Sequence, residues 1–441
     1  MNKLSYLIFL NLLLPLSLLA QDIIHPKNLR CEYLINPEGI DVKEPHLFWI
    51  SESEAKAQKQ TAYQILVASS EANLASGKAD LWDSGKILSE QSTQVKYAGK
   101  PMQSDTKVFW KVKLWDKNGK ESEWSPVASW SMGLLSPTDW KAKWIGMDNA
   151  MGAETPTANH PVMIGRMVRK EAEIKKAVKS AMLYVSAAGL YEFHINGNKV
   201  GDAVLAPALS QTEKRMYYNT YDVSKLLQKG KNVFGSYIGA GRWTSLRPLQ
   251  ETTGEWVSDK YKYTDTIPGF KPRFPKLLAQ INIVYSDGTK ESIATDGSWK
   301  LTSDGPITKN NEFDGEFYDA TKEMTGWDKP GFSDKTWINA ALVAVPTPLL
   351  SAENKEPIKI MESLKPISVK EIKQGVFIYD MGQNMVGWVK LRVKGAKGTK
   401  VKMVFSELLK ADGSLYLANM RSAEVTDQYT LRGDEIGRAH V

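Results

Sequence analysis

The residues of this 441-residue chain whose types and spacing could do chemistry are a few carboxylates. Asp314 and Glu316 stand two residues apart in the run Asp314-Gly-Glu-Phe-Tyr-Asp319, while Asp380 and Glu407 each follow an apolar run. Side chains at i and i+2 of a strand project to one face about 7 Å apart. A general acid and a general base that act through one water stand about 6.5–9.5 Å apart. The spacing fits, but any acidic pair two apart on a strand would fit it.

The same carboxylates also have a structural interpretation, which we favour. Asp314-Gly315 is a pair typical of tight turns, and the aromatic residues around it supply packing. Asp380 opens the run Asp380-Met-Gly-Gln-Asn384, which favours a turn fixed by hydrogen bonds from side chains to the backbone, and Glu407 could pair with Arg421. We therefore assign no catalytic residue to these positions.

The sequence shows no pattern typical of metal ligation, disulfide bonding or nucleic-acid binding. The five histidines have no metal-ligand spacing, and His194 alternates with Phe193 and Ile195, so we expect a half-exposed strand residue there. Cys31 is the only cysteine, so no intramolecular disulfide can form. The formal net charge of +7 is small for this length and is spread over exposed strand faces, which argues against nucleic-acid binding.

Both ends of the chain differ in composition from the rest. Residues 1–20 combine Lys3, an apolar run and a small-residue site ending at Ala20, which predicts a cleaved signal peptide and a secreted or periplasmic protein. A membrane anchor is the alternative, but Pro15 interrupts the run, and we expect no transmembrane segment after cleavage. Residues 435–441 spell the translation of a common sequencing adapter, and we interpret them so; a genuine tail is the alternative.

The elements that would position these side chains are short strands. Tyr63, Ile65 and Val67 alternate with their neighbours, as do the apolar residues from Trp110 to Leu114, and Asn118-Gly119 marks a turn. Residues 23–135 therefore predict a fibronectin-like or immunoglobulin-like β-sandwich whose tryptophans belong to the core.

Two further β domains follow. Residues 138–345 predict a jelly roll, in which Met182 to Gly201 form a hairpin turning at Asn196-Gly197. Residues 356–434 predict an incomplete β-sandwich. The fold class is thus all-β, with β-sandwich domains in tandem.

The order of several short motifs resembles the bacterial α-L-rhamnosidases of glycoside hydrolase family seventy-eight. The motifs that carry the resemblance are Asp80-Leu-Trp-Asp-Ser-Gly85, Trp130-Ser-Met-Gly-Leu-Leu135, Gly189-Leu-Tyr-Glu192, Ile195-Asn-Gly197, Val200-Gly-Asp202, Tyr218-Asn-Thr-Tyr-Asp-Val223, Gly305-Pro306, Asp314-Gly-Glu-Phe-Tyr-Asp319, Gly326-Trp327, Asp380-Met-Gly-Gln-Asn-Met-Val-Gly-Trp388, Glu407, Asn419-Met-Arg421 and Thr426-Asp427. Together they extend over residues 28–433.

The resemblance implies a hydrolase that removes terminal α-L-rhamnose, with inversion, from plant polysaccharides or glycosides. It also implies that the catalytic carboxylates belong to an (α/α)6 barrel that follows these β domains and is missing here. The chain then corresponds to an N-terminal fragment that is inactive alone, and no catalytic residue carries over. No cofactor is required.

Some members of the family bind rhamnose and calcium in the jelly roll, where hard oxygen ligands suit the cation. The corresponding candidates for sugar or calcium binding are Asp202, Asn219, Asp222, Asn232 and Trp243. Asp222 has an alternative interpretation as a turn residue, and Trp243 as a core residue. Two departures weaken this expectation: Ala240 stands where many members have an amide, and Pro207-Ala-Leu-Ser210 lacks their tryptophan.

Two other functions remain open. One is a secreted carbohydrate-binding or structural protein of β domains without catalysis. The other is a related hydrolase that acts on a different deoxysugar.

Overall fold

The computed structural model describes residues 24–155, 162–245, 273–347, 349–420, 423–433 and 437–440. The predicted signal peptide lies outside these residues, as do Arg421 and part of the terminal heptapeptide. The chain forms two compact units: one holds residues 24–36, 44–101 and 108–129, and the other holds 37–43, 102–107 and the chain from 130 onward.

The first unit contains two antiparallel sheets. One has the order β1 (His25–Cys31), β2 (His46–Glu52) and β6 (Val95–Lys96). The other has the order β4 (Trp82–Asp83), β3 (Ala62–Ala68), β7 (Lys107–Trp115) and β8 (Ala128–Ser131), with β5 (Ile87–Leu88) also on β3. A five-residue helix, α1 (Glu71–Ala75), follows β3.

Strand β7 shows why the sequence alternates there. Its inward residues Val108, Trp110, Val112 and Leu114 are fully buried. The lysines between them point outward, and Lys111 and Lys113 lie over the ring of Trp124. This confirms the predicted period of two and the core role of Trp110.

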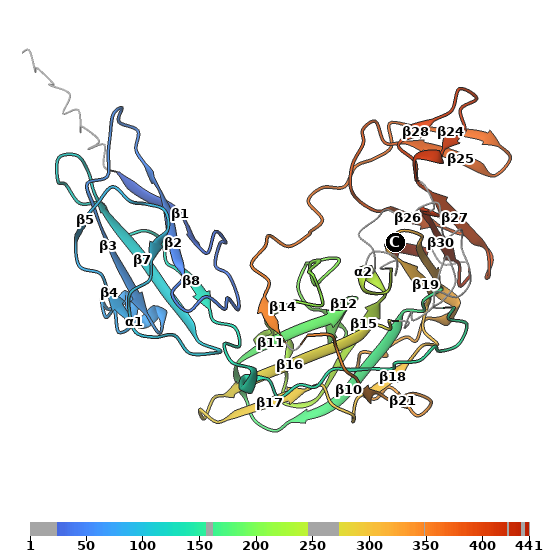
Figure 1. Ribbon diagram of the computed structural model, residues 1–441, viewed down its shortest axis with the longest axis horizontal. Helices are drawn as coiled ribbons and strands as arrows, with labels where there is room; N and C mark the ends of the chain where they lie inside the picture. Colours follow the sequence, from blue (N-terminus) through green and yellow to red (C-terminus); the bar gives the residue numbers. More distant parts are fainter. Residues whose placement is uncertain are drawn as a thin grey trace, which may run out of the picture. The chain divides into compact units, whose positions relative to one another are not determined.

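The second unit is built on a larger two-sheet sandwich (Figure 1). Its first sheet has the order β13 (Asn198–Lys199), β12 (Leu190–Ile195), β15 (Gly230–Gly239), β10 (Arg166–Ile174), β18 (Lys300–Thr302) and β21 (Ile338–Asn339). Its second sheet has the order β22 (Ala341–Leu342), β9 (Ile145–Gly146), β16 (Lys276–Tyr285), β11 (Val178–Ala188), β14 (Met216–Asp222) and β23 (Leu350–Ala352), with β17 (Lys290–Ala294) on β16.

The two sheets share one hydrophobic core. Phe193 and Phe234 from the first sheet pack with Leu183 and Ile281 from the second, and all four are buried. The described residues thus confirm the β-sandwich architecture, while the jelly-roll connectivity stays a prediction.

The predicted hairpin needs a correction. Asn196 and Gly197 do turn the chain, with φ of 53° and 85°, but they join β12 to the two-residue strand β13. The residues from Met182 to Ala188 belong to β11, which pairs with β14 and β16 in the opposite sheet. The hairpin is therefore shorter than the predicted range of 182–201.

A third sheet joins residues that are far apart in the sequence. Its order is β19 (Ile307–Asn311), β20 (Gly315–Asp319), β30 (Thr426–Thr430) and β27 (Lys400–Val404). β20 and β30 pair in parallel, with Phe317 opposite Gln428 and Asp319 opposite Thr430. This sheet attaches the last segment of the chain to the second domain.

The remaining strands form three small pairs. These are β24 (Ser368–Lys373) with β25 (Val376–Asp380), β26 (Lys390–Val393) with β31 (Gly437–His440), and β28 (Leu408–Leu409) with β29 (Leu415–Tyr416). β31 includes part of the terminal heptapeptide, whose origin as an adapter stays a prediction.

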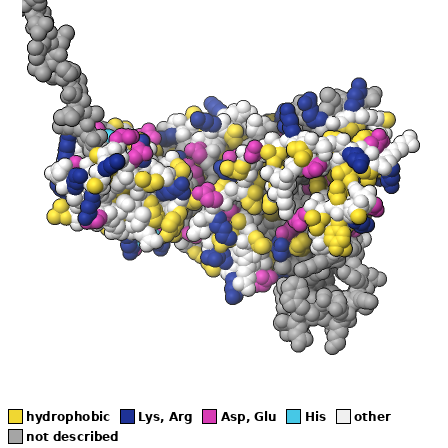
Figure 2. Space-filling view, turned by 90° about the horizontal axis from the view of Figure 1, so that it is seen from above, with side chains coloured by type: hydrophobic (Ala, Val, Ile, Leu, Met, Phe, Trp, Pro, Cys, Tyr) yellow, Lys and Arg dark blue, Asp and Glu magenta, His cyan; other side chains and the backbone are white. Residues whose placement is uncertain are grey.

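One face of the β24–β25 hairpin carries three exposed apolar side chains beside Glu371. Its register places Val369 opposite Tyr379 and Glu371 opposite Phe377, so these side chains lie on one side. Val369, Phe377 and Tyr379 are each at least 50% exposed. Figure 2 shows hydrophobic side chains at the surface over this end of the molecule.

Helices are short. Besides α1, the described residues form α2 (Gly241–Ser245) and the 3-10 turns η1 (Pro137–Asp139), η2 (Ser224–Leu226), η4 (Ala320–Lys322) and η5 (Ala418–Met420). Within the described ranges, no helix is long and apolar enough to cross a membrane. The all-β class is confirmed.

A buried ion pair fixes the start of β10. The side chains of Arg166 and Glu154 are fully buried, and Arg166 Nη2 donates to Glu154 Oε2 over 2.9 Å. Glu154 also accepts hydrogen bonds from the backbone N–H groups of Met151 and Ile164. Such a pair is compensated only while both members are present.

Glu154→Gln is therefore expected to lower the free energy of unfolding of the second unit by about 3 kcal/mol, because it leaves the Arg166 charge buried without a counter-charge. Chemical unfolding followed by tryptophan fluorescence would measure this. Glu173→Gln, on the exposed side of the same strand, should change stability by less than about 0.5 kcal/mol. Equal effects from the two variants would contradict the assigned role of Glu154.

Candidate functional site

The carboxylates of the 314–319 run do not form an acid and base pair on one strand. Asp314 precedes β20, in the turn between β19 and β20, and is 4% exposed. Its Oδ1 accepts the backbone N–H of Glu424 over 3.1 Å, and its carbonyl accepts the N–H of Thr426. Asp314 thus ties the turn to the entry of β30, as the turn interpretation implies.

Glu316 is the perturbed carboxyl of this run. Asn310 Nδ2 donates to Glu316 Oε2 over 3.0 Å, and the Glu316 backbone N–H donates to Asp427 Oδ1 over 2.9 Å. Burial raises the pKa of Glu316 to about 7, the Asn310 hydrogen bond opposes this, and the charges of Asp427 and Glu192 add to it. Burial also raises the pKa of Asp427. Two weakly acidic carboxyls therefore meet where β20 joins β30.

The later carboxylate at Asp380 also has a turn role. Its Oδ1 accepts the backbone N–H of Gly382 over 2.8 Å, which confirms the turn predicted for residues 380–384. Glu407 lies just after β27 and is exposed. Its predicted partner Arg421 lies outside the described residues.

His194 is held between two carboxylates. Its Nδ1 lies 2.8 Å from Asp328 Oδ2 and its Nε2 lies 2.9 Å from Glu192 Oε1, while Lys199 pairs with Glu192. Burial alone would lower the pKa of His194, but the hydrogen bonds to Asp328 and Glu192 outweigh it and raise the pKa to about 9. The ring is therefore an imidazolium that donates from both nitrogens at neutral pH. This arrangement is a structural clamp and leaves no free nitrogen for catalysis.

Two of the predicted sugar or calcium ligands lie in one polar cluster. The Tyr191 hydroxyl donates to Asn219 Oδ1 over 2.8 Å and lies 3.1 Å from the Tyr221 hydroxyl. Asn219 Nδ2 donates to Glu353 Oε2 over 2.9 Å. Burial raises the pKa of Tyr221, and the hydrogen bond with Tyr191 opposes this rise. The negative charges of Glu353 and Asp202 raise the pKa further. We call Tyr191, Asn219, Tyr221, Glu353 and Asp202 the tyrosine–amide cluster.

Strands β14 and β23 position this cluster. Asn219 and Tyr221 are two apart on β14 and so share a face. Glu353 follows β23, which pairs in parallel with β14, and its backbone N–H donates to the carbonyl of Tyr218. Asp202 is exposed and forms an ion pair with Lys359 at 2.9 Å. Sequence reasoning missed Glu353 because only this long-range pairing brings it beside Asn219.

The other three candidates have local partners elsewhere. Asp222 Oδ1 accepts hydrogen bonds from the backbone N–H and hydroxyl of Ser224, which fits the turn interpretation. Asn232 is fully buried, and its amide bonds to Asn196 and to the backbone of Gln228 and Gly230. Trp243 is 6% exposed, and its Nε1 donates to the carbonyl of Phe274 over 2.9 Å, which fits the core interpretation.

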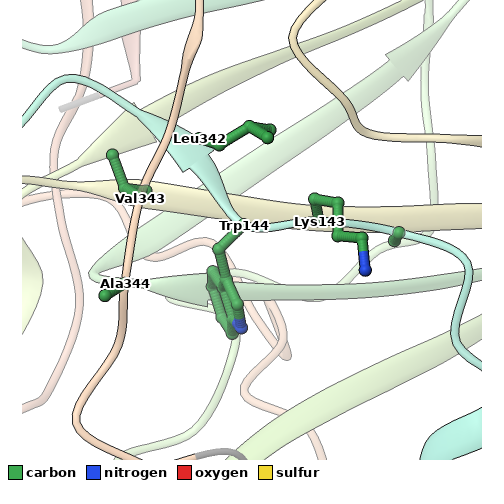
Figure 3. Close-up of a pocket in the computed structure, with 6 residues that line it drawn as sticks. Lys143, Trp144, Leu342, Val343 and Ala344 are labelled. Atoms are coloured by element: carbon green, nitrogen blue, oxygen red, sulfur yellow. The ribbon is translucent and has the colours of Figure 1, made fainter.

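One shallow hollow opens at the edge of the second sheet (Figure 3). It is lined by Ala142, Lys143, Trp144, Leu342, Val343 and Ala344. Its walls are mostly apolar, and none of the candidate residues lines it. In the part of the chain that the structure describes, no three His, Cys, Asp or Glu side chains are grouped as they would be around a metal ion. Calcium binding stays a prediction.

Comparisons with known families match three successive parts of the chain. Residues 26–136 match the Rha78A-like, N-terminal immunoglobulin domain, and residues 176–362 match the alpha-L-rhamnosidase N-terminal domain. Residues 370–440 match the bacterial alpha-L-rhamnosidase concanavalin-like domain.

Curated relatives and solved structures agree with these matches. An alpha-L-rhamnosidase of Formosa agariphila is 38% identical over 89% of this chain and 41% of its own length, and one of an Alteromonas species is 37% identical over 92% and 42%. The solved alpha-L-rhamnosidase of Dictyoglomus thermophilum is 36% identical, with a TM-score of 0.83 over 94% of this chain and 45% of that one. That of Streptomyces avermitilis, complexed with L-rhamnose, is 27% identical, with a TM-score of 0.82 over 95% and 54%.

The chain therefore spans less than half the length of the two curated relatives.

The His194 clamp predicts how stability depends on pH. The pKa of His194 is about 9 here and about 6.5 in an unfolded chain, so its contribution is complete below about pH 6.5 and is lost as pH rises through about 9. His194→Gln should lower the free energy of unfolding at pH 7 by about 2 kcal/mol.

Urea unfolding between pH 6 and 10 measures this difference. The gap between the native sequence and His194→Gln should narrow toward pH 10. His46→Gln serves as the control, because the His46 ring is 42% exposed and should contribute little. A gap that stays constant with pH would contradict the clamp.

Proposed function

We propose that the domains of this chain serve an enzyme that hydrolyses terminal α-L-rhamnose. The reason is that they match, in order, the N-terminal domains of bacterial α-L-rhamnosidases. One observation carries the proposal: three rhamnosidase domain matches follow one another from residue 26 to residue 440. Each covers a different part of the chain, so a shared fold in one domain does not explain them.

Within this proposal the described domains have no hydrolytic role of their own. Asp314 and Asp380 bond to backbone N–H groups in turns, and His194 has both ring nitrogens bonded to carboxylates. The hydrolytic groups then belong to the part of the relatives that this chain does not span. The substrate is a rhamnose-containing plant polysaccharide or glycoside, cleaved with inversion.

A second function, sugar binding, is favoured by the tyrosine–amide cluster. The hydroxyls of Tyr191 and Tyr221, the amide of Asn219 and the carboxylate of Glu353 are the kinds of group that recognise sugar hydroxyls. The exposed leucines Leu205 and Leu209 follow Asp202 in the sequence and would suit the methyl group of a deoxysugar. A calcium ion would find hard oxygen donors at Asp202 and Asn219.

Export is also part of the proposal. A secreted or periplasmic location would bring the protein to a polysaccharide outside the cell. The composition of residues 1–20 supports this.

The chain of 441 residues is expected to release no aryl leaving group from an aryl α-L-rhamnoside, because the carboxylates and the histidine considered among the described residues are engaged in structural hydrogen bonds. Absorbance of the released phenol measures this, with the Streptomyces avermitilis enzyme as the positive control. Turnover that disappears in Glu316→Gln would overturn the non-catalytic assignment.

Sugar binding is tested separately by titration calorimetry with L-rhamnose, with and without calcium. Asn219→Ala and Asp202→Ala should each weaken binding by about tenfold or more, since a lost hydrogen bond to a charged or buried group costs about 1.5 kcal/mol. Asp287→Ala, in the exposed turn between β16 and β17, should leave binding unchanged. Equal affinities of all three variants for L-rhamnose would exclude the tyrosine–amide cluster as the sugar-binding site.

A further inference from the structure

Two sequence motifs that the proposed function leaves without a role meet in space. Asp314-Gly-Glu-Phe-Tyr-Asp319 supplies β20, and Thr426-Asp427 opens β30. The parallel register that places Phe317 opposite Gln428 brings Glu316 beside Asp427. We call the paired residues 314–319 and 424–430 the junction.

Gly315 permits this close approach. Its φ is 101°, and a Cβ at this position would lie 2.1 Å from the carbonyl oxygen of Thr426 and 2.7 Å from Asp427 Oδ1. Only a residue without a side chain lets β30 come this near. The Glu316 N–H then reaches Asp427 Oδ1, so the two carboxyl-bearing residues are held together by the backbone.

No cation balances these two carboxyls among the residues that the structure describes. The groups that act on Glu316 are the Asn310 amide from β19, Asp427 from β30 and Glu192 from β12. Burial would raise the pKa of Glu192, but its bonds to His194 and Lys199 outweigh burial and lower the pKa to about 2, so Glu192 is ionised. The nearby cation Lys309 pairs with Glu424 and lies over the ring of Phe317.

We propose that the junction is a proton-dependent clamp, which is closed while Glu316 carries a proton and loosens when Glu316 and Asp427 are both ionised. When the junction loosens, the segment that carries β27 and β30 moves. The two-sheet sandwich of the second unit and the hairpin β19–β20 stay in place. A protonated Glu316 can still accept the Asn310 hydrogen bond and adds no charge beside Asp427, whereas an ionised one places a second negative charge beside the buried Asp427.

The raised pKa of Glu316 determines whether the junction becomes more or less stable as pH rises. Its value is about 7 in the folded chain and about 4.3 in an unfolded one. The folded junction therefore binds more protons between these values, and its stability falls as pH rises from about 4.3 to about 7. Well above pH 7, opening of the junction should be favoured by up to about 500-fold relative to pH 4, because the two pKa values differ by about 2.7.

Amide hydrogen exchange of the whole chain at pH 5.5 and pH 8.5, corrected for the intrinsic exchange rate, tests the clamp. Peptides that cover β27 and β30 should lose at least about tenfold protection at pH 8.5. Peptides that cover β10 and β15 in the central sheet should not change.

Variants separate the clamp from a general effect of pH. Glu316→Gln should keep β30 protected at both pH values, and Asp427→Asn provides the same comparison if the first variant folds poorly. Glu173→Gln, an exposed glutamate of β10, should behave as the native sequence does. Gly315→Ala should leave β30 unprotected at both pH values and so define the open state. Protection of native β30 that is equal at both pH values would overturn the clamp, as would an unchanged pH dependence in Glu316→Gln.

The result is independent of the proposed function. Loss of the clamp would leave the rhamnosidase assignment intact, because that assignment rests on the domain matches. Conversely, a junction that opens with pH says nothing about the substrate.

Discussion

The parallel pairing of β20 with β30 is the contact on which the last third of the chain depends. These strands lie on opposite sides of more than a hundred residues, yet they occupy the centre of one four-stranded sheet. Through that sheet β27 is fixed to the domain that contains β19. The apolar residues Tyr429 and Leu431 are buried there beside Ala320, so packing reinforces the backbone hydrogen bonds. The ion pairs Lys309–Glu424 and Arg432–Glu323 add to this attachment.

The treatment of buried charge differs between the sandwich and this sheet. In the sandwich the buried ions Arg166 and His194 have partners of opposite sign: Arg166 has Glu154, and His194 has Asp328 and Glu192. Desolvation is then offset by direct ion pairing. At Glu316 and Asp427 two acidic groups meet instead, and burial raises the pKa of both. The two kinds of site therefore respond to different pH ranges: the contribution of His194 is lost as pH rises through about 9, whereas that of Glu316 falls between about pH 4.3 and pH 7.

Local patterns in the sequence predicted much of this architecture. Alternation from Trp110 to Leu114 identified β7, and Asn196-Gly197 identified the turn after β12, because period and turn chemistry are properties of neighbouring residues. The pattern could not show that β11 and β12 belong to opposite sheets, since partner choice depends on residues far away in the chain. The same dependence on distant residues explains why only part of the candidate site was predicted. Asp202 and Asn219 were predicted, but Glu353 was not, and Asn232 and Trp243 proved to be buried.

The position of β30 in the sequence also bears on how the protein is made. A ribosome completes the hairpin β19–β20 long before it reaches residue 426, so the edge of β20 that later pairs with β30 first emerges without a partner. An unpaired strand edge can recruit a strand of another molecule. Folding must also close a long loop before this sheet forms, which makes the step slow. During synthesis the incomplete sheet is thus exposed to misassembly and to capture by chaperones.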